Sequence, residues 1–242
     1  MEADLYEYDT SELKKEVVAE NEKFSAELLL LFLLLLSKPF TPQQMNDYVA
    51  RVESTSSRSL RFIEDRLSRE LPVIAKNGIL AGNISSGKLK SPKNKRDSLK
   101  YLEDIKLSND HYDVLDTLFE QSMSGLRSHH EGMRKRFEQE AKLLVVRHRR
   151  EKMTTERNNG TINNAKTPLK TAVDPSTAFI DKGGKKWSIE HYSKMMMNRL
   201  VRDVYQESLI QFTVENKLRF GQITSNPTTT DKCLNWQNKY VK

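Results

Sequence analysis

Apolar positions recur every three to four residues along most of the first two thirds of the chain, a spacing typical of helices that bury one face. The first such stretch covers residues 11–37 and includes nine consecutive apolar residues, 28–36. A second covers residues 42–70 and a third covers residues 110–157. The pattern predicts a mainly α protein with an extended long-helix N-terminal region over residues 1–158.

Local signals predict where these helices begin and end. Thr10 or Ser11 can cap the first helix, and Thr41 precedes Pro42, which is the preferred first residue of a helix. Pro72 is expected to end the second helix, because proline lacks the N–H that an internal helical hydrogen bond needs. The polar residues 54–57 allow a break inside that helix.

Residues 77–97 are expected to form a loop, because Gly, Ser and Pro recur in them. This loop is basic and has no acid between Lys88 and Arg96. A solvated loop accounts for the charge, and so does a contact with nucleic acid or with an acidic protein surface. The distal half of the helix over residues 110–157 is also basic and can lie against phosphate groups, but a solvated helix face accounts for this charge equally well. The candidate nucleic-acid contacts are Lys88, Lys90, Lys93, Lys95, Arg96, Arg134, Lys135, Arg136, Arg147, Arg149 and Arg150.

The pattern of apolar positions changes after a polar, Asn-rich stretch, from long helical periodicity to short apolar runs. Residues 159–176 are therefore predicted to be a linker, and residues 177–242 a small α+β module. Two short apolar runs flank Gly183-Gly184 and predict a β-hairpin. A helix over residues 189–216 and short strands near the chain end complete the predicted module.

The leucine-rich run at residues 28–36 raises the question of what covers it. Nine helical residues rise about 13 Å, whereas a helix that spans a bilayer needs about 20 apolar residues. The run is therefore expected to be too short to span a membrane. The preceding residues are acidic, unlike the basic leader of a secretory signal. A run that is apolar all round needs burial on every side, so we expect the long central helix or another subunit to cover it. The residues predicted for this assembly helix are Leu28, Leu31, Phe32 and Leu35.

The composition favours a protein of long helices and argues against one held together by disulfides or zinc. The chain has 242 residues, of which 37% are hydrophobic and 30% charged, with a net charge of +7. This balance suits long helices that are exposed over much of their surface or complete their burial against partners. Cys233 is the only cysteine, which excludes an internal disulfide and a zinc site built from several cysteines.

The sequence offers no convincing catalytic set. His129 and His130 are adjacent, so their side chains point about 100° apart on a helix and are expected to lie on the surface. No phosphate-binding loop, metal-ligand cluster or acid–base group can be assembled from the motifs present. We therefore expect no enzyme activity, no cofactor and no bound metal.

The segment FIDKGGKKWSIEHYSKMM, residues 179–196, resembles the phage minor capsid protein 2 family, which is related to the Mu F-like head morphogenesis proteins. The likeness extends over about residues 177–240, and it departs from the family's pattern at Asn226, Thr230 and Asn238. If relatives hold a metal through His and Cys at such positions, this chain should not. The residues that carry the resemblance are Phe179, Asp181, Gly184, Trp187, Tyr192, Met195, Tyr205, Cys233 and Trp236.

The resemblance implies a structural minor capsid protein of a tailed phage. Such a protein would lie in the virion, in the capsid interior or at the portal vertex, after synthesis in the host cytoplasm. Its partners would be the portal protein, other head proteins and packaged or ejected double-stranded DNA, with several copies around a symmetric portal. The alternatives are a standalone basic nucleic-acid-binding protein and, less favoured, an enzyme or toxin.

Overall fold

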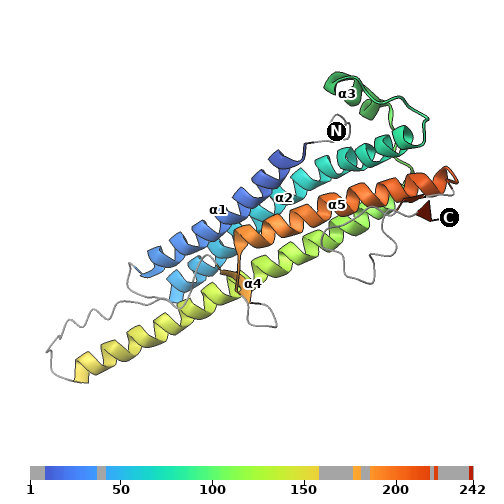
Figure 1. Cartoon of the computed structure of the whole chain (residues 1–242). Helices are drawn as coiled ribbons and strands as arrows, with labels where there is room; N and C mark the ends of the chain where they lie inside the picture. Colours follow the sequence, from blue (N-terminus) through green and yellow to red (C-terminus); the bar gives the residue numbers. More distant parts are fainter. Residues whose placement is uncertain are drawn as a thin grey trace. The chain divides into compact units, whose positions relative to one another are not determined.

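The computed structural model describes residues 9–36, 42–157, 177–180, 186–218, 221–222 and 240–241. This part of the chain is mainly helical, as the sequence predicts (Figure 1). Its helices are α1 (Ser11–Leu36), α2 (Pro42–Ser85), α3 (Lys95–Asp104), α4 (Asn109–Arg157) and α5 (Ile189–Glu215).

The described residues belong to two compact units. Unit 2 contains residues 9–72 and 116–203, and unit 1 contains residues 73–115 together with residues from 204 onward. The helices α2, α4 and α5 each contribute residues to both units. Neither unit coincides with the predicted regions, and the predicted linker lies outside the described residues.

Polar side chains begin several helices by accepting hydrogen bonds from backbone N–H groups that lack a partner in the helix. The Asp9 carboxylate accepts from the Ser11 N–H at 2.9 Å, next to the start of α1. The Asn94 side chain accepts from the Asp97 N–H at 2.9 Å and caps α3. Ser188 caps α5 by accepting from the His191 N–H at 3.1 Å.

The predicted end of α2 is wrong. The helix continues through Pro72 to Ser85, so residues 77–85 are helical rather than part of a loop, and it does not break at residues 54–57. Burial explains the continuation, because the apolar side chains after Pro72 lie in the core of unit 1 and supply more stability than the proline removes. These buried side chains are Ile74, Ala75, Ile79, Leu80 and Ala81.

The glycines in this stretch permit close packing within unit 1. A Cβ atom on Gly78 would lie 2.5 Å from the backbone oxygen of Tyr205, and one on Gly82 would lie 2.4 Å from the Phe212 ring. Both distances are too short for a carbon contact. Gly78 and Gly82 therefore bring α2 and α5 together inside this unit and do not mark a turn.

The core of unit 2 joins α1, α2 and α4, together with Ile189 at the start of α5. One face of α1 contributes four side chains, and the Phe32 and Phe137 rings meet edge to face with centroids 5.8 Å apart. Aromatic rings favour this arrangement because the positive edge of one meets the negative face of the other. The buried members of the cluster are Phe24, Leu28, Phe32, Leu35, Tyr48, Val52, Met133, Phe137, Ala141 and Ile189.

Short antiparallel strand pairs flank α5 in the sequence. Strand β1 (Thr177–Ile180) pairs with β2 (Lys186–Ser188), and Phe179 lies opposite Trp187. Strand β3 (Gly221–Gln222) pairs with β4 (Tyr240–Val241). These two-stranded pairs do not confirm a separate α+β module, and α5 contributes to both helical units. The module remains a prediction.

Candidate nucleic-acid interface and other candidate sites

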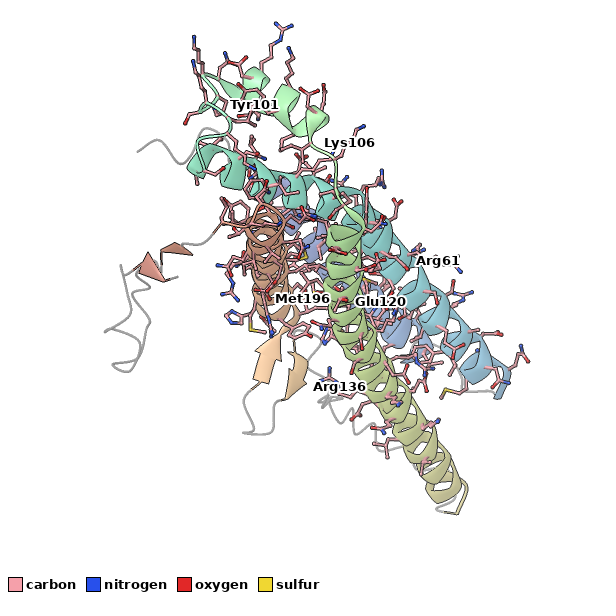
Figure 2. All side chains as sticks on the ribbon, turned by 90° about the vertical axis from the view of Figure 1, so that its right-hand side faces the viewer. Arg61, Tyr101, Lys106, Glu120, Arg136 and Met196 are labelled. Atoms are coloured by element: carbon pink, nitrogen blue, oxygen red, sulfur yellow. The ribbon has the colours of Figure 1, made fainter. Side chains whose placement is uncertain are left out.

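The basic segment, defined here as residues 90–106, includes α3 and lies in unit 1. Its lysines and arginine are exposed, and none forms an ion pair within the described part of the chain. Figure 2 shows side chains extending outward from α3, with Tyr101 and Lys106 labelled. The segment also contains Asp97, Glu103 and Asp104, so cations outnumber acids two to one. The unpaired cations are Lys90, Lys93, Lys95, Arg96, Lys100 and Lys106.

Lys88, also predicted as a nucleic-acid contact, contacts other residues of unit 1. Its ammonium group donates a hydrogen bond to the Asn216 side chain and lies 5.5 Å from the centre of the Phe212 ring. A cation over an aromatic face is attracted by the negative charge of the ring face. Lys88 therefore differs from the outward-facing cations that follow it.

The predicted cations of α4 have a different environment in unit 2. Arg134 is 22% exposed and contacts carboxylate oxygens of Glu53, Glu131 and Glu138 at 2.9, 2.7 and 3.0 Å. The hydrogen bond from Arg134 lowers the pKa of Glu131 to about 2. Lys135 also pairs with Glu131, at 3.2 Å. The charges of both cations are therefore largely compensated within the protein.

The other predicted cations of α4 are Arg136, Arg147, Arg149 and Arg150. Burial lowers the pKa of Arg136, because a charged guanidinium loses hydration there. The side chains of Arg147, Arg149 and Arg150 lie outside the described residues. Among the predicted cations whose side chains the structure describes, Lys90, Lys93, Lys95 and Arg96 are thus the ones that are exposed and form no ion pair there.

The leucine-rich run is divided between core and surface. Three of its four predicted assembly residues, Leu28, Phe32 and Leu35, are buried in the core of unit 2, whereas Leu31 is half-buried. The long central helix α4 covers this buried side, in line with one of the two expectations. On the opposite side, Leu30, Leu33 and Leu34 are 57%, 49% and 46% exposed. The run is therefore not buried on every side.

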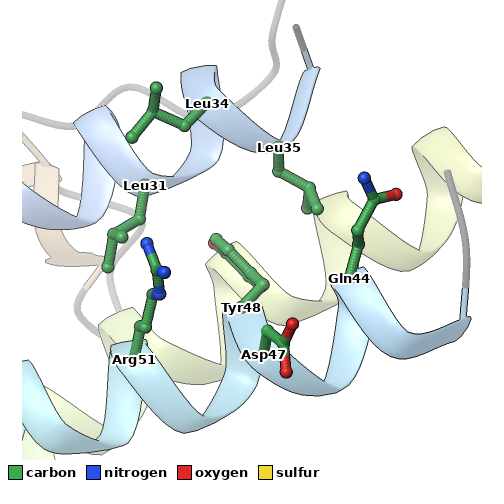
Figure 3. Close-up of a pocket in the computed structure, with 7 residues that line it drawn as sticks. All are labelled: Leu31, Leu34, Leu35, Gln44, Asp47, Tyr48 and Arg51. Carbon is green, nitrogen blue, oxygen red and sulfur yellow. The ribbon is translucent and has the colours of Figure 1, made fainter. Parts of the chain in front are cut away.

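A small cavity lies between the end of α1 and the start of α2 (Figure 3). Its volume is about 130 Å³, which is enough for one apolar side chain. The Tyr48 ring forms part of its wall, and burial, with a smaller contribution from the Glu138 charge, raises the pKa of this residue. The lining residues are Leu31, Leu34, Leu35, Gln44, Asp47, Tyr48 and Arg51.

His129 and His130 are buried in unit 2, so the expectation of surface histidines is wrong. The Asn21 amide donates to the Val17 carbonyl at 3.0 Å, which leaves its oxygen to accept from His130 Nε2 at 2.9 Å. His130 Nδ1 then accepts from the Ser56 hydroxyl at 3.3 Å. This set of contacts connects α1, α2 and α4 through one ring with both nitrogens hydrogen-bonded.

The two imidazoles are neutral at pH 7. Burial, with a smaller contribution from the Arg136 charge, lowers the pKa of His129 to about 4. Burial and the neighbouring His129 lower the pKa of His130 to about 3. The contacts of Ser56, His130 and Asn21 resemble a nucleophile–base–orienter set, but a base this weak does not take up a proton near neutral pH. The histidines therefore have a structural role here.

A second serine–histidine–acid contact lies in unit 1. The Ser108 hydroxyl is 2.6 Å from both His111 Nδ1 and a Glu215 carboxylate oxygen, and it also accepts from the His111 backbone N–H at 3.4 Å. Serine and acid approach the same ring nitrogen, unlike the opposite nitrogens of a catalytic triad. Ser108 precedes the first residue of α4, so this arrangement caps the helix and links it to Glu215.

The residues that carry the family resemblance are only partly described. Tyr192 is half-buried, with its ring centroid 5.0 Å from that of His129, and Met195 is 43% exposed. Tyr205 is half-buried in unit 1, and Phe179 pairs with Trp187 in the backbone register of β1 and β2. Asp181, Gly184, Cys233 and Trp236 lie outside the described residues.

Two kinds of site are absent from the described part of the chain. No three His, Cys, Asp or Glu side chains gather there in an arrangement that could hold a metal ion. None of the helices over those residues combines the length and the apolar composition needed to cross a membrane.

Comparison with known proteins gives no match: no protein-family model, no curated protein and no solved structure matches this chain.

Proposed function

We propose that the protein is a structural minor capsid protein of a tailed phage, located at or near the portal, which acts by binding and not by catalysis. The phage assignment is supported only by the sequence resemblance over about residues 177–240. Its proposed partners are the portal protein, other head proteins and packaged or ejected DNA.

The basic segment supports the DNA contact. Its six cations are exposed and form no ion pair within the described residues, so phosphate groups need not displace a carboxylate to reach them. The compensated cations of α4 would lose existing partners on binding. A cation that neutralises a phosphate releases a condensed counterion from the DNA, which favours binding at low salt and is independent of sequence.

Measuring DNA affinity against salt tests the electrostatic part of the proposal. The logarithm of the binding constant should fall linearly with the logarithm of the salt concentration, with a slope of about −0.9 for each phosphate contact. Four contacts would give a slope of about −3.6. A slope near zero, or no binding to a 30-bp duplex at low salt, would contradict a phosphate-driven contact.

Co-purification with the portal protein separates the phage-head function from that of a standalone nucleic-acid-binding protein. Both use the basic segment, but only the head protein should be retained on immobilised portal rings and be detected in purified particles by mass spectrometry. A chain that binds DNA and is absent from particles would support the standalone alternative.

A further inference from the structure

A groove lies between α4 and α5 in unit 2, with a volume of about 360 Å³. Figure 2 labels Met196 on α5 and Glu120 on α4, the two helices that form its walls. The volume falls within the range of pockets that bind ligands and is large enough for a bulky side chain. We call it the methionine groove; its apolar lining comes from Leu118, Tyr192, Met195, Met196 and Leu200.

The lining is adaptable. Methionine has an unbranched, flexible and polarisable side chain, and surfaces that accept varied apolar partners often use it. Met195 is 43% exposed, whereas Ser193, two residues earlier and therefore on the other side of the helix, is buried. An apolar group entering the groove would cover Met195 and remove it from water.

Gly125 keeps one wall of the groove open. A Cβ atom at this position would lie 3.3 Å from the Tyr192 hydroxyl oxygen, so any larger side chain would crowd the space in front of Tyr192. Gly132 lies on the same helix, but a Cβ atom there would have no neighbour within 4 Å. The two glycines therefore form a matched pair, of which only one borders the groove.

One end of the groove carries excess positive charge. Arg199 and Asp203 line it, and the Asp203 carboxylate accepts from Arg199 at 3.3 Å and from Arg202 at 3.0 Å. A single carboxylate cannot compensate two guanidinium groups, and Arg199 is 77% exposed. On the α4 side the polar lining is neutral, consisting of Gln121 and Ser122. A ligand with a carboxylate at this end would meet Arg199.

We infer that the methionine groove docks an acidic segment of a partner protein, which inserts one large apolar side chain and places a carboxylate beside Arg199. Peptide segments commonly bind grooves between helices through such anchor residues. A second copy of this chain is a poorer fit, because a stable dimer buries about 800 Å² on each partner, whereas the groove accommodates one inserted side chain and the residues beside it. The inference rests on the proposed function only in expecting a protein partner.

The experiment uses the full chain with ¹³C-labelled methionine methyl groups and a probe peptide of about twelve residues, in which acidic residues flank one tryptophan. Binding should shift the Met195 and Met196 signals and leave the buried Met123 and Met133 signals in place. Replacing the tryptophan by alanine should weaken binding about tenfold, and replacing the acidic residues by lysine about fivefold.

Two matched glycine variants and one arginine variant test where on the protein the peptide binds. Gly125→Leu should weaken binding about tenfold, whereas Gly132→Leu should leave it unchanged within about twofold, although both substitutions raise helix propensity equally. Arg199→Gln should remove most of the preference for the acidic peptide and retain the tryptophan dependence. Circular dichroism verifies that each variant is folded.

Three results would overturn the inference: equal effects of Gly125→Leu and Gly132→Leu, peptide-induced shifts that miss Met195 and Met196, or concentration-dependent shifts without peptide that report a second copy. A fourth result, saturable binding of decanoate with loss of the peptide effect, would also overturn it and would assign the groove to a small amphipathic carboxylate. DNA affinity measured on the same variants should not change, so failure here is distinguishable from failure of the proposed function.

Discussion

The imidazole of His130 lies in the interior of unit 2, stacked on the Phe24 ring at a centroid distance of 3.9 Å and hydrogen-bonded at both nitrogens. A buried polar group of this kind stabilises one particular helix arrangement, because any other would leave its donor or acceptor without a partner. The imidazole is held in its neutral state by burial, since protonating Nδ1 would place a charge in the interior of the unit and would require the Ser56 hydroxyl to change from donor to acceptor.

Acidification should therefore destabilise the protein before most carboxylates titrate. The folded pKa values of His129 and His130, about 4 and about 3, lie below the ordinary value of 6.5, so the unfolded chain binds more protons as the pH falls below 6.5. Each buried histidine should remove about 1.4 kcal/mol of unfolding free energy per pH unit from pH 6.5 down to its folded pKa. Urea unfolding at pH 7, 6 and 5 measures this slope.

Replacing His130 removes one of the two buried imidazoles and provides the control for that slope. His130→Gln should make the pH dependence between 7 and 5 shallower than in the wild-type protein. A stability that is flat over this range in the wild-type protein would show that His129 and His130 are not held neutral by burial.

At the scale of elements, α2 illustrates where sequence patterns fail. The stretch NGILAGNIS was expected to form a loop because glycines often mark turns, yet it is helical and buried. What decides the outcome is the approach of Tyr205 and Phe212 to Gly78 and Gly82, more than 120 residues away in the sequence. By contrast, the ends of α1, α4 and α5 were predicted within one residue, because capping residues and apolar spacing are local signals.

Gly78→Ala tests this account of α2. Alanine is the better helix former, but its Cβ atom would lie 2.5 Å from a backbone oxygen that cannot move aside like a side chain. We expect the free energy of unfolding to fall by about 1–3 kcal/mol. Gly132→Ala, with open space around it, should raise that free energy by about 0.5–1 kcal/mol. Changes of the same sign in both variants would refute close packing at Gly78.

The two sides of α1 should also respond differently to substitution. Leu28→Ala removes a fully buried side chain and should cost about 2–5 kcal/mol of unfolding free energy. The double variant Leu30→Gln/Leu33→Gln changes half-exposed positions and should cost less than about 1 kcal/mol. Thermal or urea unfolding compares them, and equal losses would mean that Leu30 and Leu33 are covered in solution.

At the scale of the whole molecule, the sequence predicts the helical class and the exposed lysines of residues 90–96, since a run of cations without acids has nothing local to pair with. The partners Glu131 and Glu138 of Arg134 lie three and four residues away on the same helix and could have been read from the sequence. The contact with Glu53 could not, because that residue is 81 residues away. The sequence also places His129 and His130 on the surface, since Asn21 and Ser56 come from other helices. The cavity and the methionine groove were not foreseen either, as both depend on how helices pack.

The central claim is that the exposed, unpaired cations of the basic segment contact DNA. Replacing Lys90, Lys93, Lys95 and Arg96 by glutamine should make the salt dependence of DNA binding shallower by as much as about 3.6 in slope. The matched control replaces four exposed cations of unit 2 that form no ion pair within the described residues: Lys15, Arg51, Arg61 and Lys142.

Fluorescence anisotropy of a labelled duplex across a salt series, with both variants at equal net charge, is the most direct test. The account predicts a shallower slope and weaker binding for the basic-segment variant, with the control close to the wild type. Equal losses in the two variants would contradict it, because they would show that net charge, and not this segment, binds DNA.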